Sequence, residues 1–126
     1  KIFKKGIDGS RIRKILNIKG NEKLLLFVGR LSPLKNVHTL LKIFNLVKEK
    51  LSNTKLLIAG KPTFKNYYKK LKDMANKDVI FKEYIKDKEL PCYYAACDLY
   101  VTASLWEGFN LPIFKRAFQG INVPLS

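Results

Sequence analysis

The stretch 24–51, LLLFVGRLSPLKNVHTLLKIFNLVKEKL, decides the fold of this 126-residue chain. It opens with an apolar run over residues 24–28 that lacks polar alternation, which is typical of a parallel strand buried on both faces. A loop over residues 29–36 leads into a predicted helix over residues 37–51. Six apolar side chains fall on one face of that helix: Val37, Leu40, Leu41, Phe44, Val47 and Leu51. Strand, loop and amphipathic helix in this order predict one βα unit.

The same unit recurs along the chain. Further short apolar runs lie at residues 56–59, 79–81 and 99–101. Apolar side chains at helical spacing predict two helices between these runs, one burying Phe64, Tyr68, Leu71 and Ala75 and the other burying Leu90, Tyr93, Tyr94 and Cys97. Asp87 is expected to cap the second of these helices. Alternating strands and helices predict an α/β protein with a Rossmann-like open parallel sheet and helices on both of its faces.

The chain is expected to hold a single domain over residues 23–126, preceded by a basic and irregular lead-in over residues 1–22. Within that lead-in, Ile12, Ile15 and Leu16 indicate one short helix. No apolar run approaches the roughly 18 residues that cross a bilayer. We therefore expect a soluble, cytoplasmic protein.

Cysteine and histidine usage argues against a metal centre. Cys92 and Cys97 lie five residues apart on one predicted helix and point to different faces, so a mutual disulfide is not expected and a reducing compartment fits. Neither cysteine has the paired spacing of a zinc site, and the single histidine, His38, falls in the first turn of a predicted helix. No protein-built metal site is expected.

Twenty-five Lys and Arg against ten Asp and Glu give a net charge of +15. Most of these cations are interpreted as solvated helix faces, as at Lys14, Lys48, Lys69, Lys72 and Lys86. A diffuse attraction to anionic lipid, nucleic acid or substrate stays open as the alternative. Nucleic acid is the least expected of these partners, because the aromatic residues fall at buried helical spacings and no RNA-binding or helix-turn-helix signature is present.

Ligands of such sheets bind outside the carboxyl ends of the strands, and two loops qualify. In the first, over residues 29–36, Gly29 allows a sharp turn, Arg30 offers a rigid fork of donors, and Lys35 adds a mobile charge near a helix N-terminus. This combination suits a diphosphate, although it is also ordinary loop composition.

The second loop covers residues 104–112 and enters a helix predicted to run to about residue 118. Asn110 suits its cap and Pro112 its first turn, so the free amides near Phe109, Asn110 and Leu111 can hold phosphate oxygens. Beside such a site, Glu107 suits hydrogen bonds from sugar hydroxyls. A solvated loop acid or a helix-capping acid is an equally good interpretation of Glu107.

Four segments in register resemble the C-terminal, nucleotide-sugar-binding domain of retaining glycosyltransferases of the GT-B type, the group 1 glycosyl transferases. They are FVGRLSPLKNVHTLL, KLLIAGKP, VIFKEYIKDKELPCYYAACDLYVTAS and EGFNLP. In addition, Gly6-Ile7-Asp8 resembles the stretch by which the family leaves its interdomain linker, which makes residues 1–22 the lead-in from that linker. The resemblance implies a hexosyltransferase that uses a nucleoside-diphosphate sugar as substrate, without a further cofactor or a metal.

The resemblance also implies roles for individual residues. Arg30 and Lys35 would grip the diphosphate and stabilise it as the leaving group, and Glu107 would face the donor sugar. The remaining donor-binding positions would be Gly29, Gly60, Lys61, Ile85, Gly108, Phe109, Asn110 and Leu111. The stretch containing Tyr84 and Ile85 matches a segment that borders the base, although Glu83 replaces a customary glycine there.

Two departures from the family pattern leave alternatives open. Lys115 stands where a second glutamate accepts hydrogen bonds from the ribose, so Lys115 either meets an extra phosphate or a different nucleotide, or marks a degenerate domain that serves as an interaction module. In addition, the family domain continues past Gly120 and works with an N-terminal acceptor domain. We therefore expect this chain to be a truncated half of a GT-B glycosyltransferase that is inactive alone, with its acceptor domain in the same or a separate chain. We also expect peripheral contact with the cytoplasmic face of an anionic membrane.

Overall fold

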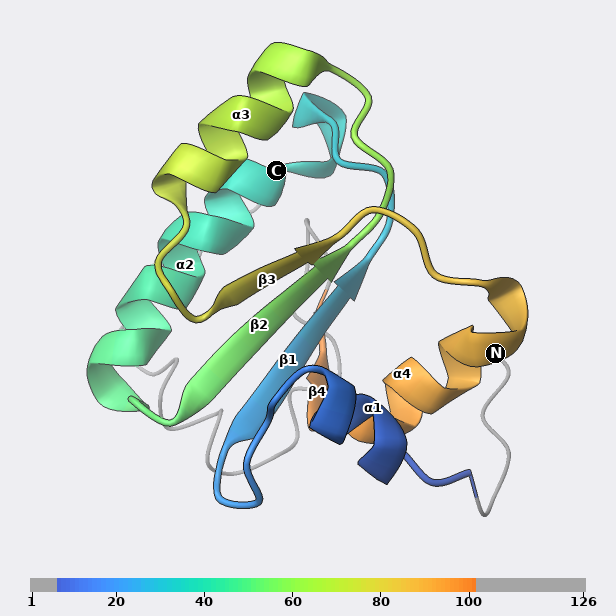
Figure 1. Cartoon of the computed structure of the whole chain (residues 1–126). Coiled ribbons are helices and arrows are strands. Elements are labelled where there is room, and N and C mark those ends of the chain that lie inside the picture. Colours follow the sequence, from blue (N-terminus) through green and yellow to red (C-terminus); the bar gives the residue numbers. More distant parts are fainter. Residues whose placement is uncertain (1–6, 102–126) are drawn as a thin grey trace.

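The computed structural model describes residues 7–101, which form a four-stranded, all-parallel sheet in the order β3-β2-β1-β4 (Figure 1). The strands are β1 (Lys23–Val28), β2 (Thr54–Ala59), β3 (Val79–Lys82) and β4 (Leu99–Tyr100). The chain steps outward from β1 to β3 and then returns to place β4 on the other side of β1. This arrangement confirms the predicted Rossmann-like α/β fold, and it puts a reversal of strand order beside β1.

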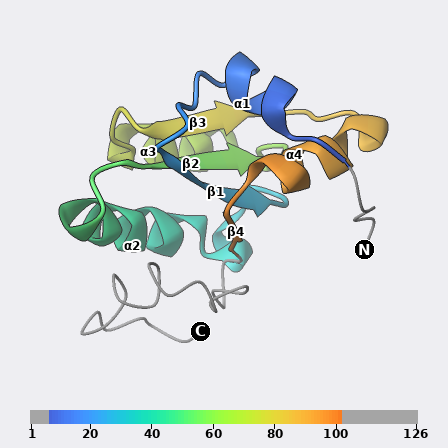
Figure 2. The same ribbon diagram turned by 90° about the horizontal axis from the view of Figure 1, so that it is seen from below.

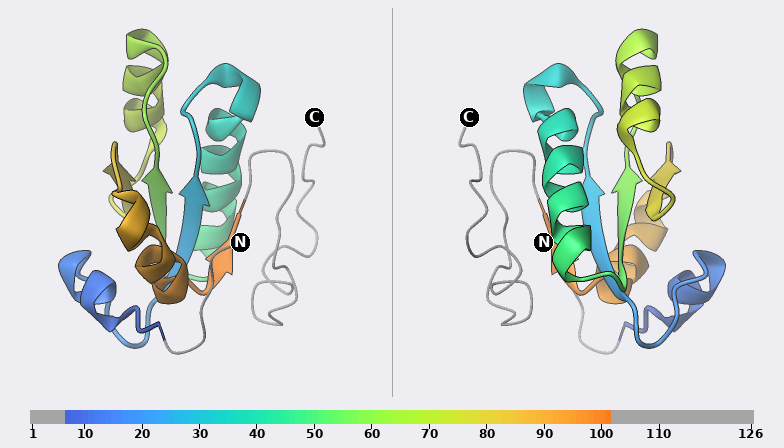
Figure 3. Two further views of the ribbon diagram at one scale, coloured as in Figure 1. Left: turned by 90° about the vertical axis from the view of Figure 1, so that its right-hand side faces the viewer. Right: turned by 90° about the vertical axis from the view of Figure 1, so that its left-hand side faces the viewer.

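The helices are α1 (Ser10–Ile15), α2 (Val37–Lys50), α3 (Lys65–Met74) and α4 (Leu90–Ala96), with 3₁₀ turns η1 (Pro33–Lys35) and η2 (Asp87–Glu89). Figure 2 shows α1 and α2 on opposite sides of the strands, and Figure 3 shows α1 and α4 together, with the strands between them and α2. The predicted helices on both faces of the sheet are therefore confirmed.

The strands alternate between two cores because successive side chains of a strand point to opposite faces. Leu25 and Phe27 join the cluster formed with α2 and α3, whereas Leu24 and Leu26 join the cluster formed with α1 and α4. Every residue predicted for the apolar face of the first long helix packs in the first of these clusters, with Leu51 only partly buried. The apolar runs of β1 and β2 are thus explained by burial on both faces. β3 differs, because it lies at the sheet edge and all four of its residues are only partly buried.

Three predicted details of the later helices are wrong. Phe64 is 55% exposed, because α3 starts one residue later and Phe64 flanks it in an extended conformation. Asp87 makes no capping hydrogen bond, because the Lys86 carbonyl opens this turn and leaves Asp87 as its first residue. Cys97 lies outside α4, which ends at Ala96.

The prediction that Lys48 lies on a solvated helix face is also wrong. Lys48 is largely buried and forms an ion pair with Asp78, with 2.7 Å between Nζ and Oδ2. Its ammonium group also donates to the carbonyls of Ser52 and Thr54. Lys48 thus joins the end of α2 to the loops at the amino ends of β2 and β3.

The helix predicted around Ile12 is confirmed as α1, and it packs closely on α4. Ile12 is fully buried, and a Cβ atom added to Gly9 would lie 2.4 Å from the Ala96 Cα atom. Only a glycine fits such close contact between backbones. The division of the chain at residue 22 stays a prediction, although α1 shares the core of residues that follow it.

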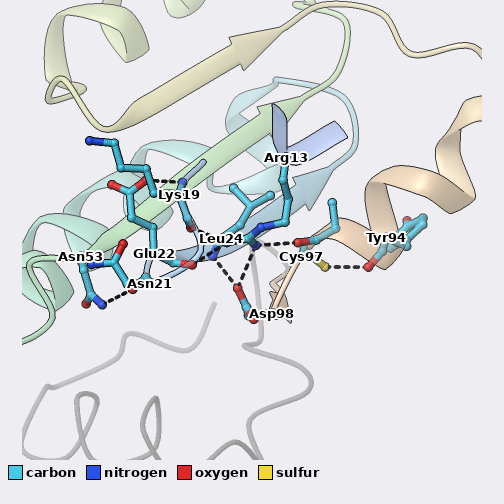
Figure 4. A network of polar contacts seen from close by, with 10 residues as sticks. Arg13, Lys19, Asn21, Glu22, Leu24, Asn53, Tyr94, Cys97 and Asp98 are labelled. Atoms are coloured by element: carbon cyan, nitrogen blue, oxygen red, sulfur yellow. Dashed lines mark hydrogen bonds and ion pairs between the residues drawn. The ribbon is translucent and has the colours of Figure 1, made fainter. Parts of the chain in front are cut away.

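Arg13 connects α1 to two other parts of the chain (Figure 4). Its guanidinium donates to the carbonyl oxygens of Ala96 at 3.0 Å, Lys19 at 2.9 Å and Glu22 at 2.7 Å. It also faces Asp98, which in turn accepts a 2.8 Å hydrogen bond from the Leu24 backbone amide. One side chain therefore ties α1 to the start of β1 and to the connection between α4 and β4.

Both cysteines are free thiols. The Cys97 thiol donates to the Tyr94 carbonyl oxygen at 3.2 Å, as drawn in Figure 4. Burial raises the pKa of Cys97 to about 12, with the neighbouring Asp98 charge adding to the effect. Because the thiolate is the reactive form, Cys97 is expected to be inert at neutral pH.

Replacing Thr54 with valine is expected to stabilise the protein. Thr54 is fully buried, and its hydroxyl has no hydrogen-bond partner among residues 7–101. A buried hydroxyl without a partner costs about 1–3 kcal/mol, and valine keeps the shape and the preference for a strand. We expect the free energy of unfolding in urea to rise by about 1 kcal/mol. A decrease would mean that this hydroxyl is satisfied in the folded protein.

Candidate functional site

A cleft of about 290 Å³ opens at the carboxyl ends of β1, β2 and β3. Its lining comes from the residues that end these strands, from the loops that follow them, and from the start of α4: Val28, Gly29, Arg30, Ala59, Gly60, Lys61, Glu83, Tyr84, Ile85, Asp87 and Leu90. The cleft therefore lies beyond the carboxyl ends of the strands, where ligands of open α/β folds bind.

Backbone forms the floor of this cleft. Gly29, Gly60 and Glu83 each follow the last aligned residue of adjacent strands, because Ala59 pairs with both Val28 and Lys82. The amide of Gly29 donates to Ala59, and that of Gly60 donates to Lys82. A Cβ atom on Gly60 would lie 1.6 Å from the Gly29 carbonyl oxygen, so this position requires glycine. With no side chains on either glycine, a ligand can approach the main chain closely.

The loop after β1 is pinned to the loop after β2. Leu31 is buried, its amide donates to the Lys61 carbonyl at 3.1 Å, and its carbonyl accepts from Thr63 at 3.2 Å. The loop then forms η1 and reaches Asn36, whose φ of 55° is in the left-handed region that asparagine tolerates better than most residues. These bonds fix the position of Arg30, which is exposed and lines the cleft.

The predicted cationic pair is not brought together at the cleft lining. Lys35 is exposed at the end of η1 and is not among the lining residues within 7–101, because the 3₁₀ turn carries it beyond Arg30. Lys61, in contrast, enters the cleft from the loop after β2. The structure thus gathers five of the predicted positions: Gly29, Arg30, Gly60, Lys61 and Ile85. The other predicted positions, Glu107, Gly108, Phe109, Asn110, Leu111 and Lys115, lie outside the described residues.

Sequence reasoning missed several lining residues, among them Asp87 and Leu90. It assigned them to a helix cap and a buried helix face, whereas both border the cleft. The available signal was their distance of a few residues from the end of β3, since the loops after parallel strands meet at one edge. Glu83 and the 72% exposed Tyr84 belong to the same side of the cleft.

His38 lies in the first turn of α2, as predicted, and contacts Tyr67 of α3. Its Nδ1 atom is 2.6 Å from the Tyr67 hydroxyl oxygen, which also accepts from the His38 backbone amide at 3.2 Å. Burial lowers the pKa of His38, and the nearby Lys70 and Lys42 charges add to that shift. The imidazole therefore joins two helices away from the cleft.

No group of three or more His, Cys, Asp or Glu side chains within residues 7–101 is placed to hold a metal ion. No helix of the same range has the length and apolar character needed to cross a membrane.

Comparison with known families decides what this cleft belongs to. Residues 8–114 match the family described as glycosyl transferases group 1. The chain belongs to this family. The resemblance inferred from the four sequence segments is therefore confirmed, and the cleft lies in a group 1 glycosyltransferase domain.

Curated relatives agree with this assignment. The chain is 28% identical to an uncharacterized glycosyltransferase of Methanocaldococcus jannaschii, over 90% of this chain and 30% of that protein. It is 32% identical to the alpha-monoglucosyldiacylglycerol synthase of Streptococcus pneumoniae, over 89% of this chain and 26% of that protein. The chain thus spans under a third of the length of these relatives.

Solved structures show which part of a group 1 enzyme the chain represents. The C-terminal domain of LpcC, a group 1 family protein from Francisella tularensis, has a TM-score of 0.61 at 24% identity, covering 87% of this chain and 59% of that chain. WaaG, a glycosyltransferase of lipopolysaccharide biosynthesis, has a TM-score of 0.57 at 27% identity, over 75% of this chain and 26% of that chain. The fold is that of the C-terminal domain of a GT-B glycosyltransferase.

Proposed function

We propose that this group 1 domain binds the nucleoside-diphosphate sugar donor of a retaining hexosyltransferase. The observation that carries the proposal is the cleft at the carboxyl edge of the sheet, with glycine backbone as its floor and Arg30 at its rim. An N-terminal domain, in the same or a separate chain, would bind the acceptor.

The cleft suits a diphosphate for physical reasons. Gly29 and Gly60 line the cleft without side chains, so phosphate oxygens can approach their main chain. Arg30 supplies a planar fork of donors and Lys61 a second positive charge. Two proteins of similar fold support this interpretation: TarM of S. aureus was solved with UDP, and starch synthase IV of Arabidopsis thaliana with ADP.

In the proposed reaction, the bond between the anomeric carbon and the diphosphate oxygen breaks, and the nucleoside diphosphate leaves with the electron pair. An acceptor hydroxyl oxygen bonds to the anomeric carbon in its place, and the proton of that hydroxyl passes to the departing diphosphate. Fixed cations aimed at the departing diphosphate oxygen stabilise the developing charge more than they stabilise the bound donor, so they lower the barrier. We assign this role to Arg30, with Lys35 approaching once donor is bound, and we assign contact with the sugar to Glu107. Transfer without a metal, a cytoplasmic location and contact with anionic membrane are further parts of the proposal.

Replacing Arg30 with alanine is expected to weaken binding of every nucleoside diphosphate by about tenfold to a hundredfold, because a charge-assisted hydrogen bond to phosphate contributes about 1.5–3 kcal/mol. Calorimetric titration with UDP-glucose, GDP-mannose and the free diphosphates measures the effect. Arg11→Ala is the matched control, since it removes the same charge from an exposed site on α1.

The result that contradicts the proposal is a folded protein without saturable binding at millimolar concentrations of any of these ligands. That outcome would favour the alternative, a degenerate domain that acts as an interaction module.

A further inference from the structure

Charge is distributed unevenly across the cleft. Arg30 and Lys61 follow β1 and β2, whereas the carboxylates of Glu83 and Asp87 follow β3. Because the strand order is β3-β2-β1, the residues that follow β3 and β1 are two strand spacings apart, or roughly 10 Å. The cleft thus has a cationic end and, across the sheet, an acidic end.

The Glu83 carboxylate is free to bind a ligand. Three acids of the described range pair within the protein, Asp78 with Lys48, Asp98 with Arg13, and Glu22 with Lys55, whereas Asp87 of the cleft lacks a partner in that range, as Glu83 does. No hydrogen bond or ion pair joins Glu83 to another residue of the range 7–101, although Glu83 lines the cleft. A carboxylate in an anion-binding cleft is unfavourable unless it accepts hydrogen bonds from a neutral part of the ligand.

The four common bases differ in the hydrogen-bond donors and acceptors that they present to a carboxylate. Guanine presents two adjacent N–H donors, N1–H and the N2 amino group, which match both oxygens of one carboxylate. Uracil presents one N–H between two carbonyl oxygens, which a carboxylate repels. Adenine and cytosine each place an acceptor nitrogen beside their amino group, so only one of the two carboxylate oxygens can be satisfied.

We propose that the donor carries guanine and that Glu83 selects this base by accepting its N1–H and N2–H hydrogen bonds. The inference rests on the proposed function, because it requires the diphosphate at the Arg30 end of the cleft. Asp87 adds negative potential at the same end without being required for the bidentate pair.

Tyr84 complements this selection. Its side chain is 72% exposed and lines the same end of the cleft. An exposed aromatic ring stacks on any base, since every base has a π face, so Tyr84 adds affinity without preference. Affinity and selectivity are therefore assigned to neighbouring residues, Tyr84 and Glu83.

Titration of the whole 126-residue chain with GDP, UDP, ADP and CDP tests the inference. We expect GDP to bind about tenfold to a hundredfold tighter than the other three, as for a bidentate contact to a base edge. Glu83→Gln replaces one acceptor oxygen with a donor and should remove most of this preference, because GDP binding weakens while UDP binding stays the same or tightens once the uracil carbonyl oxygens no longer face a carboxylate. Glu49→Gln, at an exposed site on α2, is the matched control and should keep the preference.

Different failures separate the two proposals. Binding of UDP as tight as GDP by the unmodified chain would overturn guanine selection and leave the proposed function intact. An equal loss for all four nucleotides in Glu83→Gln would also overturn it, because that pattern indicates a contact to the shared ribose. Failure of all four diphosphates to bind would instead overturn the proposed function.

Discussion

Gly60→Ala is expected to destabilise the protein by about 3 kcal/mol or more, and to abolish nucleotide binding as well. The added Cβ atom would lie 1.6 Å from the Gly29 carbonyl oxygen, which is main chain and has no alternative rotamer. Relief of the clash requires β1 and β2 to separate where the Gly29 and Gly60 amides make their last sheet bonds. The same movement would distort the floor of the cleft.

Urea unfolding and titration with GDP and UDP measure the two effects of Gly60→Ala. Gly20→Ala is the matched control, because a Cβ atom there meets nothing within 4 Å. We expect the control to change the free energy of unfolding by less than about 0.5 kcal/mol. Equal stability of the two variants would show that the Gly29 and Gly60 main chains do not approach this closely.

Arg13→Ala is expected to lower the free energy of unfolding by about 2–3 kcal/mol. The change removes the donor to three carbonyl oxygens, on Lys19, Glu22 and Ala96, and leaves the partly buried Asp98 without its cation. Because bonds made by a charged donor contribute more than neutral ones, their joint loss exceeds that of an exposed ion pair. Arg13 is far from the groups that line the cleft, so nucleotide affinity should change little in the folded variant.

Two control variants separate the geometry of Arg13 from its charge. Arg11→Ala removes the same charge from an exposed position of α1 and should be nearly neutral. Arg13→Lys keeps the charge but lacks the planar fork, so it should retain only a part of the stability. Thermal unfolding of the three variants measures the difference. Equal unfolding midpoints for Arg11→Ala and Arg13→Ala would mean that the network in Figure 4 contributes little.

The sequence predicted the positions of the strands well, because burial on both faces of a parallel sheet demands continuous apolar runs such as residues 24–28. It also placed the cleft, since the loops after parallel strands must meet at one edge. It failed at helix starts, as Phe64 and Asp87 show. A shift of one residue changes which side chain flanks the helix without changing the apolar pattern.

Local sequence therefore determined the α/β class, the faces of the long helix, and the place of Gly29 and Arg30 at the carboxyl ends of the strands, whereas Gly60, Lys61 and Ile85 were predicted from the family resemblance. Only the tertiary structure decided which charged side chains bond to other groups of the protein and which have no partner within residues 7–101. Lys48 and Arg13 have the same local signature as any solvated cation, yet each bonds to carbonyl oxygens brought to it by another segment. Glu83 resembles any loop acid, yet the order of the strands places it across the cleft from Arg30. Charge pairing depends on distances through space, which the linear order of residues does not specify.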